Sequence, residues 1–165
     1  VLDAISRINH GHINMWFDYL PYARQDRVCA PGQAAAKRAY LDILEYQLFS
    51  FDSYEIHVVD VHSNDGYPLG MNIVNHPVHQ LIPNQLLADA VLVAPDKGAI
   101  HRVVKVAERN NNDVIYFEKH RNPSTGVIES ISTTYDLSSY RDQRFLIIDD
   151  ICDGGGTFVP IIRQL

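Results

Sequence analysis

Acidic side chains and a run of glycines stand close together near the end of the sequence. Asp149 and Asp150 are adjacent, and the segment Asp153-Gly-Gly-Gly-Thr157 follows them. Paired carboxylates bind hydroxyl groups or a cation. Glycines tolerate positive φ and lack a Cβ, so they leave backbone N–H groups open to a phosphate. The pattern indicates an anion-binding loop beside two acids, with a tight turn after ordinary strand-end residues as the alternative.

The segments on either side of this loop predict a strand and a helix. Phe145 to Ile148 is a short, continuous apolar run, which is typical of a strand buried on both faces of a parallel sheet. Thr157 suits a helix N-cap, so a helix is expected from Phe158 onward, with its first N–H groups near the same anion. The glycine loop is thus expected between a buried strand and a helix.

This segment resembles the ribose-phosphate motif of the type I phosphoribosyltransferase fold, in which apolar residues precede two acids and a Gly-rich loop ending in Thr. The resemblance implies that Asp149 and Asp150 hold ribose hydroxyls and that Asp153, Gly154, Gly155, Gly156 and Thr157 hold the 5-phosphate. Gly154 stands where the family usually has Thr, which removes a hydroxyl donor but keeps the backbone cradle.

A second candidate segment, Leu20 to Arg27, follows an apolar run at residues 13–19 that predicts a strand. Arg24 and Arg27 offer forked donors for phosphates, while Gln25 and Asp26 offer groups for a base or a hydroxyl. A solvated surface loop is the alternative. Pro-Tyr-Ala-Arg-Gln-Asp-Arg is very similar to the ATP-binding segment of ribose-phosphate diphosphokinases, also called PRPP synthetases. That resemblance implies ATP binding by these four polar residues.

Two further strands are expected to end near a histidine and near an acid. Residues 56–61 lead to His62, and residues 90–94 lead to Asp96 in Pro-Asp-Lys-Gly98. A hydrogen-bonded surface histidine is the alternative for the first. The contexts resemble the Asp-Leu-His and Pro-Asp-x-Gly segments of the same diphosphokinases. The resemblance implies that His62 lies near the ATP phosphates and shares Mg²⁺ with Asp96. Ala99 stands where the family usually has a second Gly.

The segment Glu118 to Gly126 follows an expected strand at residues 114–117, and residues 127–134 predict a returning strand. It is basic and then rich in Pro, Ser and Gly, which is typical of a mobile loop that closes over a polyphosphate. A solvated hairpin is the alternative. Lys119 and Arg121 match the Lys-x-Arg of the catalytic flexible loop of PRPP synthetases. The resemblance implies that both cations stabilise the transferring phosphoryl group.

Composition limits the class of protein. The chain has 165 residues, 46% of them hydrophobic and 21% charged, and a formal net charge of −6, which argues against nonspecific nucleic-acid binding. No apolar run reaches the ~20 residues of a membrane span. Cys29 and Cys152 stand far apart, so we expect neither a zinc site nor a disulfide framework, and a reduced, cytoplasmic setting.

We expect an α/β fold of two tandem phosphoribosyltransferase-like domains, with mainly parallel sheets flanked by helices. Residues 1–82 form the ATP-binding domain and residues 83–165 the ribose-5-phosphate-binding domain, with a break at Ile82-Pro-Asn84. Helices are expected at residues 33–50 and 99–109. The sequence begins without Met inside a helical pattern, so we expect both domains to be incomplete.

The segments that carry the resemblance occur in family order along nearly the whole chain. They imply a ribose-phosphate diphosphokinase that uses Mg²⁺, ATP and ribose 5-phosphate, forms a homo-oligomer at full length, and requires neither nucleic acid nor a membrane. Two alternatives remain open. One is a phosphoribosyltransferase that consumes PRPP, and the other is a noncatalytic regulatory subunit of a synthetase. Lys119, Arg121, His62 and Asp96 argue against the second.

Overall fold

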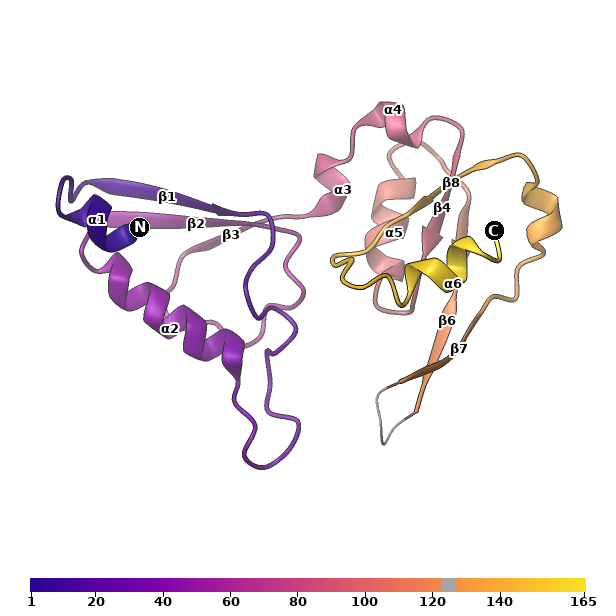
Figure 1. Ribbon diagram of the computed structural model, residues 1–165. Helices are drawn as coiled ribbons and strands as arrows, with labels where there is room; N and C mark the ends of the chain where they lie inside the picture. The colour runs from indigo at the N-terminus through magenta and orange to yellow at the C-terminus, as the bar shows by residue number, and fades with distance from the viewer. Residues whose placement is uncertain (123–126) are drawn as a thin grey trace. The chain divides into compact units, whose positions relative to one another are not determined.

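The computed structural model describes residues 1–122 and 127–165, and the chain divides into two compact units, Val1–Pro77 and Val78–Leu165 (Figure 1). Each unit contains a parallel sheet with helices against it, so the α/β class predicted from the sequence is confirmed. Across the described residues, no helix is both long enough and apolar enough to cross a membrane.

The first unit is built on three parallel strands in the order β1-β2-β3, namely His12–Phe17, Ser53–Val59 and Ile73–His76. Helix α1 (Leu2–Ser6) precedes them, and α2 (Ala36–Leu48) runs along one face of the sheet (Figure 1). Leu41, Leu44 and Leu48 of α2 bury their side chains against Ile56 and Val58 of β2. Because these leucines recur at helical spacing, they form one apolar face that packs α2 against the sheet.

The second unit has β4 (Ala90–Ala94) at its centre, between β5 (Val114–Tyr116) and β8 (Arg144–Ile147) in one parallel sheet. Every residue of β4 is buried, because helices cover both faces. Leu92 faces the cluster that includes α5 (Ile100–Ala107), whereas Val91 and Val93 face the cluster that includes Ile161 of α6 (Phe158–Ile162). Alternation along the strand sends successive side chains to opposite faces, which explains the continuous apolar run.

The remaining elements of the second unit surround this sheet. Helices α3 (Val78–Leu81) and α4 (Asn84–Leu87) precede β4, and the 3₁₀ helix η1 (Leu137–Tyr140) precedes β8. Strands β6 (Glu118–Arg121) and β7 (Ile128–Ser132) form an antiparallel ribbon (Figure 1). The expected mobile loop therefore begins as a strand, as in the hairpin alternative. Its Pro/Ser/Thr/Gly part, residues 123–126, lies outside the described residues.

The boundary between the units falls after Pro77, whereas the sequence predicted it after residue 82. Val78 and Ile82 pack against the buried cluster around Leu92, and the Ile82 N–H donates to the Val78 carbonyl. Residues 78–82 thus belong to the second core, which accounts for the difference. Pro83 marks the start of α4 instead of a break between domains.

Candidate functional site

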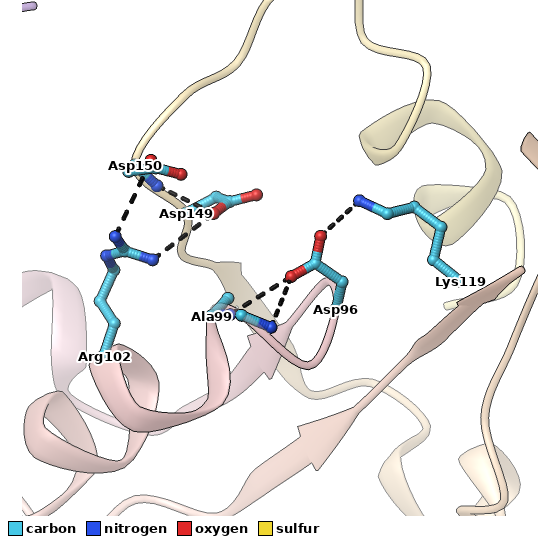
Figure 2. Close-up of polar contacts among 7 residues, drawn as sticks. Asp96, Ala99, Arg102, Lys119, Asp149 and Asp150 are labelled. Carbon is cyan, nitrogen blue, oxygen red and sulfur yellow. Dashed lines mark hydrogen bonds and ion pairs between the residues drawn. The ribbon is translucent and has the colours of Figure 1, made fainter. Parts of the chain in front are cut away.

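The carboxyl ends of β4 and β8 bring together acids that are distant in the sequence. Because these strands are parallel neighbours in register, Val93 opposite Ile147, the segments that leave them meet at one edge of the sheet. Asp96 follows β4, and Asp149 and Asp150 follow β8. Figure 2 shows these carboxylates together with Arg102 and Lys119. This edge is where open α/β sheets bind their ligands.

Asp96 is held by the loop that starts α5. Its Oδ1 accepts hydrogen bonds from the N–H groups of Gly98 (2.9 Å) and Ala99 (3.3 Å), and its Oδ2 accepts one from the Lys119 ammonium. Burial raises the pKa of Asp96, but the hydrogen bond and charge of Lys119, together with the two N–H groups, bring that pKa below its usual value. Asp96 is therefore an ionised carboxylate with a fixed orientation.

Asp149 has the opposite electrostatic environment. Its Oδ1 accepts a hydrogen bond from the Asp150 N–H at 2.9 Å, and the Arg102 guanidinium lies 3.6 Å from Asp149 and 4.0 Å from Asp150 (Figure 2). Burial raises the pKa of Asp149 to about 7, and so do the hydrogen bond with the Asp150 carboxyl and the charges of Asp150 and Asp96. Asp149 therefore holds its proton up to a higher pH than an ordinary aspartate does.

Lys119 and Arg121 both lie in β6 but have different surroundings. The Lys119 side chain is largely buried and forms an ion pair with Asp96, whereas Arg121 is exposed. The sequence predicted a mobile loop in this segment, whereas the Lys119 side chain is bound to Asp96. The low exposure of this ion pair means that its two charges are screened poorly by water, so Lys119 is held over Asp96.

A cavity of about 840 Å³ lies beside the Asp96–Lys119 ion pair. Its walls come from the loop before α5, from the β5–β6 segment and from the residues after β7, including Tyr116, Thr134 and Tyr135. An ionised carboxylate, an ammonium group and aromatic walls around a space of this size suit a polar ligand with an organic part.

The glycine loop has the backbone freedom that the sequence predicted, at one position. Gly155 has φ +74°, and a Cβ there would lie 3.3 Å from Val159 Cγ2, whereas Gly154 and Gly156 face open space. Thr157 is the N-cap of α6, as expected, but its side chain makes no capping hydrogen bond. The loop is therefore open to a ligand at two of its three glycines.

In the first unit, the predicted nucleotide loop and His62 lie on neighbouring segments. The loop follows β1 and His62 follows β2, which pair in parallel. Ser63 donates a hydrogen bond from Oγ to Asp26 Oδ2 at 2.5 Å. This bond lowers the pKa of Asp26 although burial raises it, and the charges of Arg27 and His62 contribute in the same direction as the bond. Arg24, Gln25, Arg27 and His62 are exposed.

Two residues of these sites were not predicted from the sequence. Arg102 faces Asp149 and Asp150 from α5, and Ser63 holds Asp26. Arg102 looks like any cation on an amphipathic helix until β4 and β8 are known to be neighbours. The signal for Ser63 was its position directly after His62, at the end of a strand.

The donor chemistry fits a magnesium ion only in part. Mg²⁺ commonly takes one or two carboxylates and completes its shell with waters and substrate phosphates, and Asp96 is an ionised carboxylate. No three His, Cys, Asp or Glu side chains gather as a metal centre within residues 1–122 and 127–165. Asp96 Oδ2 is also bonded to Lys119. A metal ion at Asp96 therefore has to compete with this ammonium.

Comparisons with known proteins agree with this architecture. Residues 72–165 match the phosphoribosyl transferase domain family. The ribose-phosphate pyrophosphokinase of Saccharolobus solfataricus is 33% identical over 149 residues, which are 88% of this chain and 49% of that protein. The ribose-phosphate pyrophosphokinase of Pyrococcus furiosus is 28% identical over 99% of this chain and 58% of its own length. The chain thus spans about half the length of the curated relatives it matches.

A solved structure shows the same fold. The crystal structure of phosphoribosylpyrophosphate synthetase from Mycobacterium smegmatis superposes with a TM-score of 0.71 and 21% sequence identity, over 98% of this chain and 52% of that one. The resemblance read from the motifs is thereby confirmed at the level of family and fold.

Proposed function

This chain belongs to the phosphoribosyl transferase domain family, and on that premise we propose that the protein that contains it is a ribose-phosphate pyrophosphokinase, which is another name for a ribose-phosphate diphosphokinase. It would transfer the diphosphate of Mg-ATP to the 1-hydroxyl of ribose 5-phosphate, giving PRPP and AMP for nucleotide biosynthesis. The observation that carries the proposal is the cluster of Asp96, Lys119, Asp149 and Asp150 at one edge of the second sheet. The names of the relatives favour the same reaction.

The second unit is proposed to bind ribose 5-phosphate. Asp149 and Asp150 would accept hydrogen bonds from the ribose hydroxyls, which is favoured by their place at a strand end beside Arg102. The segment from Asp153 to Thr157 would bind the 5-phosphate through backbone N–H groups. Open space at Gly154 and Gly156 supports this assignment, since a phosphate has to approach the backbone closely.

The first unit is proposed to be the ATP-binding domain. Arg24 and Arg27 would bind phosphates and Gln25 and Asp26 the nucleoside, while His62 lies next to this loop in the same unit. His62 and Asp96 are each proposed as ligands of Mg²⁺. Bound there, the ion would neutralise charge on the ATP phosphates.

The side chains of the chain itself would supply positioning and charge. In the proposed step, the 1-hydroxyl oxygen of ribose 5-phosphate attacks the β-phosphorus, and the bond from that phosphorus to the oxygen shared with the α-phosphate breaks. AMP leaves with that oxygen, and the proton of the attacking hydroxyl is released to water. Lys119 and Arg121 would stabilise the charge that develops on the transferring group. For Lys119 this requires that the ion pair with Asp96 opens first.

The cellular context is proposed from the same family. Relatives that are metabolic enzymes favour a cytoplasmic protein, and we propose a homo-oligomer at full length that binds no nucleic acid.

Product analysis tests the proposal. The protein carrying this sequence is incubated with ATP, Mg²⁺ and ribose 5-phosphate, and the nucleotides are separated by chromatography. AMP that forms only when ribose 5-phosphate is present is the expected result. Release of diphosphate from PRPP that depends on an added base, without AMP formation from ATP, would favour a phosphoribosyltransferase instead. No turnover of either substrate pair would favour a regulatory subunit.

A further inference from the structure

A buried lysine lies between the two loops of the first unit. Lys37, in the first turn of α2, is 1% exposed, and its Nζ donates hydrogen bonds to the carbonyls of Ser63 and Asp65, each at 2.7 Å. The same ammonium lies 4.1 Å from the centre of the Tyr67 ring. Its three N–H donors thus face two carbonyls and an aromatic face.

The position of this ammonium is costly without those partners. Burial lowers the pKa of Lys37, while the charges of Asp26 and Asp65 act in the opposite direction. The positive end of the α2 dipole also disfavours a cation in the first turn. A buried ammonium that lost its carbonyl partners would be left desolvated and unpaired. The cation is therefore stable only while residues 63–65 keep this arrangement.

The backbone of the same residue holds the other loop. The Lys37 N–H donates to the Gln25 carbonyl at 3.1 Å, within the predicted nucleotide segment. The two loops also contact each other directly, through the Ser63 hydroxyl on Asp26 and through Gly66, where a Cβ would lie 3.1 Å from the Asp26 carbonyl oxygen. One helical residue thus joins the segment after β1 to the segment after β2.

We propose that Lys37 is a positioning residue for nucleotide binding, which fixes residues 24–27 relative to His62 by binding one loop through its N–H and the other through its ammonium. This inference rests on the proposed function for its link to ATP. The geometry on which it depends lies wholly within the first unit. Lys37 itself need not touch the nucleotide, because its ammonium is already occupied.

Amide hydrogen exchange tests the positioning role without any substrate. Lys37→Met keeps an unbranched side chain that is one atom shorter, and it removes the ammonium. The amides of Gln25, bonded to the Tyr22 carbonyl, and of Val61, bonded to Asn75 Oδ1, report on the two loops, and the buried Ile56 amide reports on the core. We expect exchange at both loop amides to rise roughly tenfold or more relative to Ile56.

Leu44→Ala is the matched control, since Leu44 lies two turns further along α2, is buried in the core and has a side chain that cannot donate a hydrogen bond to either loop. It should change loop and core exchange together. The proposal is overturned if Lys37→Met gives the same ratio of loop to core exchange as Leu44→Ala. It is also overturned if Lys37→Met and Lys37→Gln both fail to fold while Leu44→Ala folds, because the core would then be what needs the lysine.

Steady-state kinetics test whether Lys37 affects nucleotide binding. We expect Lys37→Met to raise KM for ATP by roughly ten- to a hundredfold, while KM for ribose 5-phosphate stays within a few fold. Equal effects on both substrates would contradict the role in nucleotide binding. If the parent protein makes no AMP, the proposed function fails, yet the exchange experiment still decides whether Lys37 positions the loops.

Discussion

At the scale of single residues, two carboxyl groups at one sheet edge differ in their ionisation. The pKa of Asp96 is lowered because Lys119 and two N–H groups outweigh burial, whereas burial and neighbouring acids raise the pKa of Asp149 to about 7. Groups whose environments move their pKa values apart are common where a site must both hold charge and exchange protons. Asp96 is thus suited to bind a cation, and Asp149 to bind hydroxyl groups.

The raised pKa of Asp149 predicts a dependence of stability on pH. Between the pKa of an unfolded aspartate, about 3.9, and the folded value of about 7, the native state binds the extra proton. Its contribution to stability is full below that range and is lost as the pH rises through about 7. Asp149→Asn should therefore stabilise the chain at pH 8, by on the order of 1–3 kcal/mol, and far less at pH 5.

Urea denaturation of parent and variant at both pH values measures this difference. Asp113→Asn serves as the control, because Asp113 is exposed at the start of β5. A gain from Asp149→Asn of the same size at pH 5 and pH 8 would show that the pKa of Asp149 is not raised in the folded chain.

Lys119 and Arg121 are expected to act on the rate of the chemical step. Because developing charge is what such cations would stabilise, Lys119→Ala and Arg121→Ala should each lower kcat by roughly 10²-fold or more. KM for both substrates should stay within a few fold. Lys105→Ala, an exposed cation on α5, should leave both constants unchanged. A large increase in KM at constant kcat would instead assign the two residues to ground-state binding.

At the scale of elements, local pattern predicted the strands better than the connections. The apolar run at Ala90–Ala94 is β4 to the residue, because a strand covered on both faces needs apolar side chains on both. Helix α2 (Ala36–Leu48) is shorter than the predicted 33–50. It begins later than predicted because the Gln33 side chain accepts a hydrogen bond from the Cys29 N–H and so belongs to the preceding loop. The contact of Arg102 with Asp149 and Asp150 could not be predicted, because it depends on the order of the strands, which no single segment of the sequence contains.

The glycine loop gives a prediction for a single element. Gly154 has open space and an ordinary φ, so Gly154→Ala should leave stability within about 0.5 kcal/mol. Gly155 has φ +74°, so Gly155→Ala should cost about 1 kcal/mol or more. If the loop binds phosphate through its backbone, Gly154→Ala should still weaken ribose 5-phosphate binding.

Calorimetric titration of ribose 5-phosphate into parent and Gly154→Ala protein makes the measurement, with thermal unfolding as the check on the fold. A variant that is as stable as the parent and binds equally well would show that the loop is only a turn.

At the scale of the whole molecule, the proposed chemistry draws on both units. Each unit places its candidate residues on segments that leave parallel strands, Asp26 and His62 in the first, and Asp96 and Asp149 in the second. The tandem arrangement followed from the repeat of strand, polar loop and helix in the sequence. The position of the boundary between the units did not follow from the sequence, because the few residues of α3 carry no pattern that assigns them to one core or the other.

His62 in the first unit and Asp96 in the second are each proposed to bind Mg²⁺, and each proposal is tested by its own variant. His62→Ala and Asp96→Ala should each increase the Mg²⁺ concentration needed for half-maximal activity, by roughly tenfold for the loss of one ligand. His101→Ala, an exposed histidine on α5, is the control. If both variants had the same magnesium dependence as the parent, neither residue would be a ligand of Mg²⁺.

The fate of the β-phosphorus of ATP tests the proposed transfer of a diphosphate group. The protein is incubated with Mg²⁺, ATP and ribose 5-phosphate, and the products are followed by ³¹P NMR. We expect the β- and γ-phosphorus atoms to move together onto the ribose, so that AMP and a 1-diphosphate appear in equal amounts. Formation of ADP with a single new phosphate on the ribose, or an unchanged ATP spectrum, would contradict it.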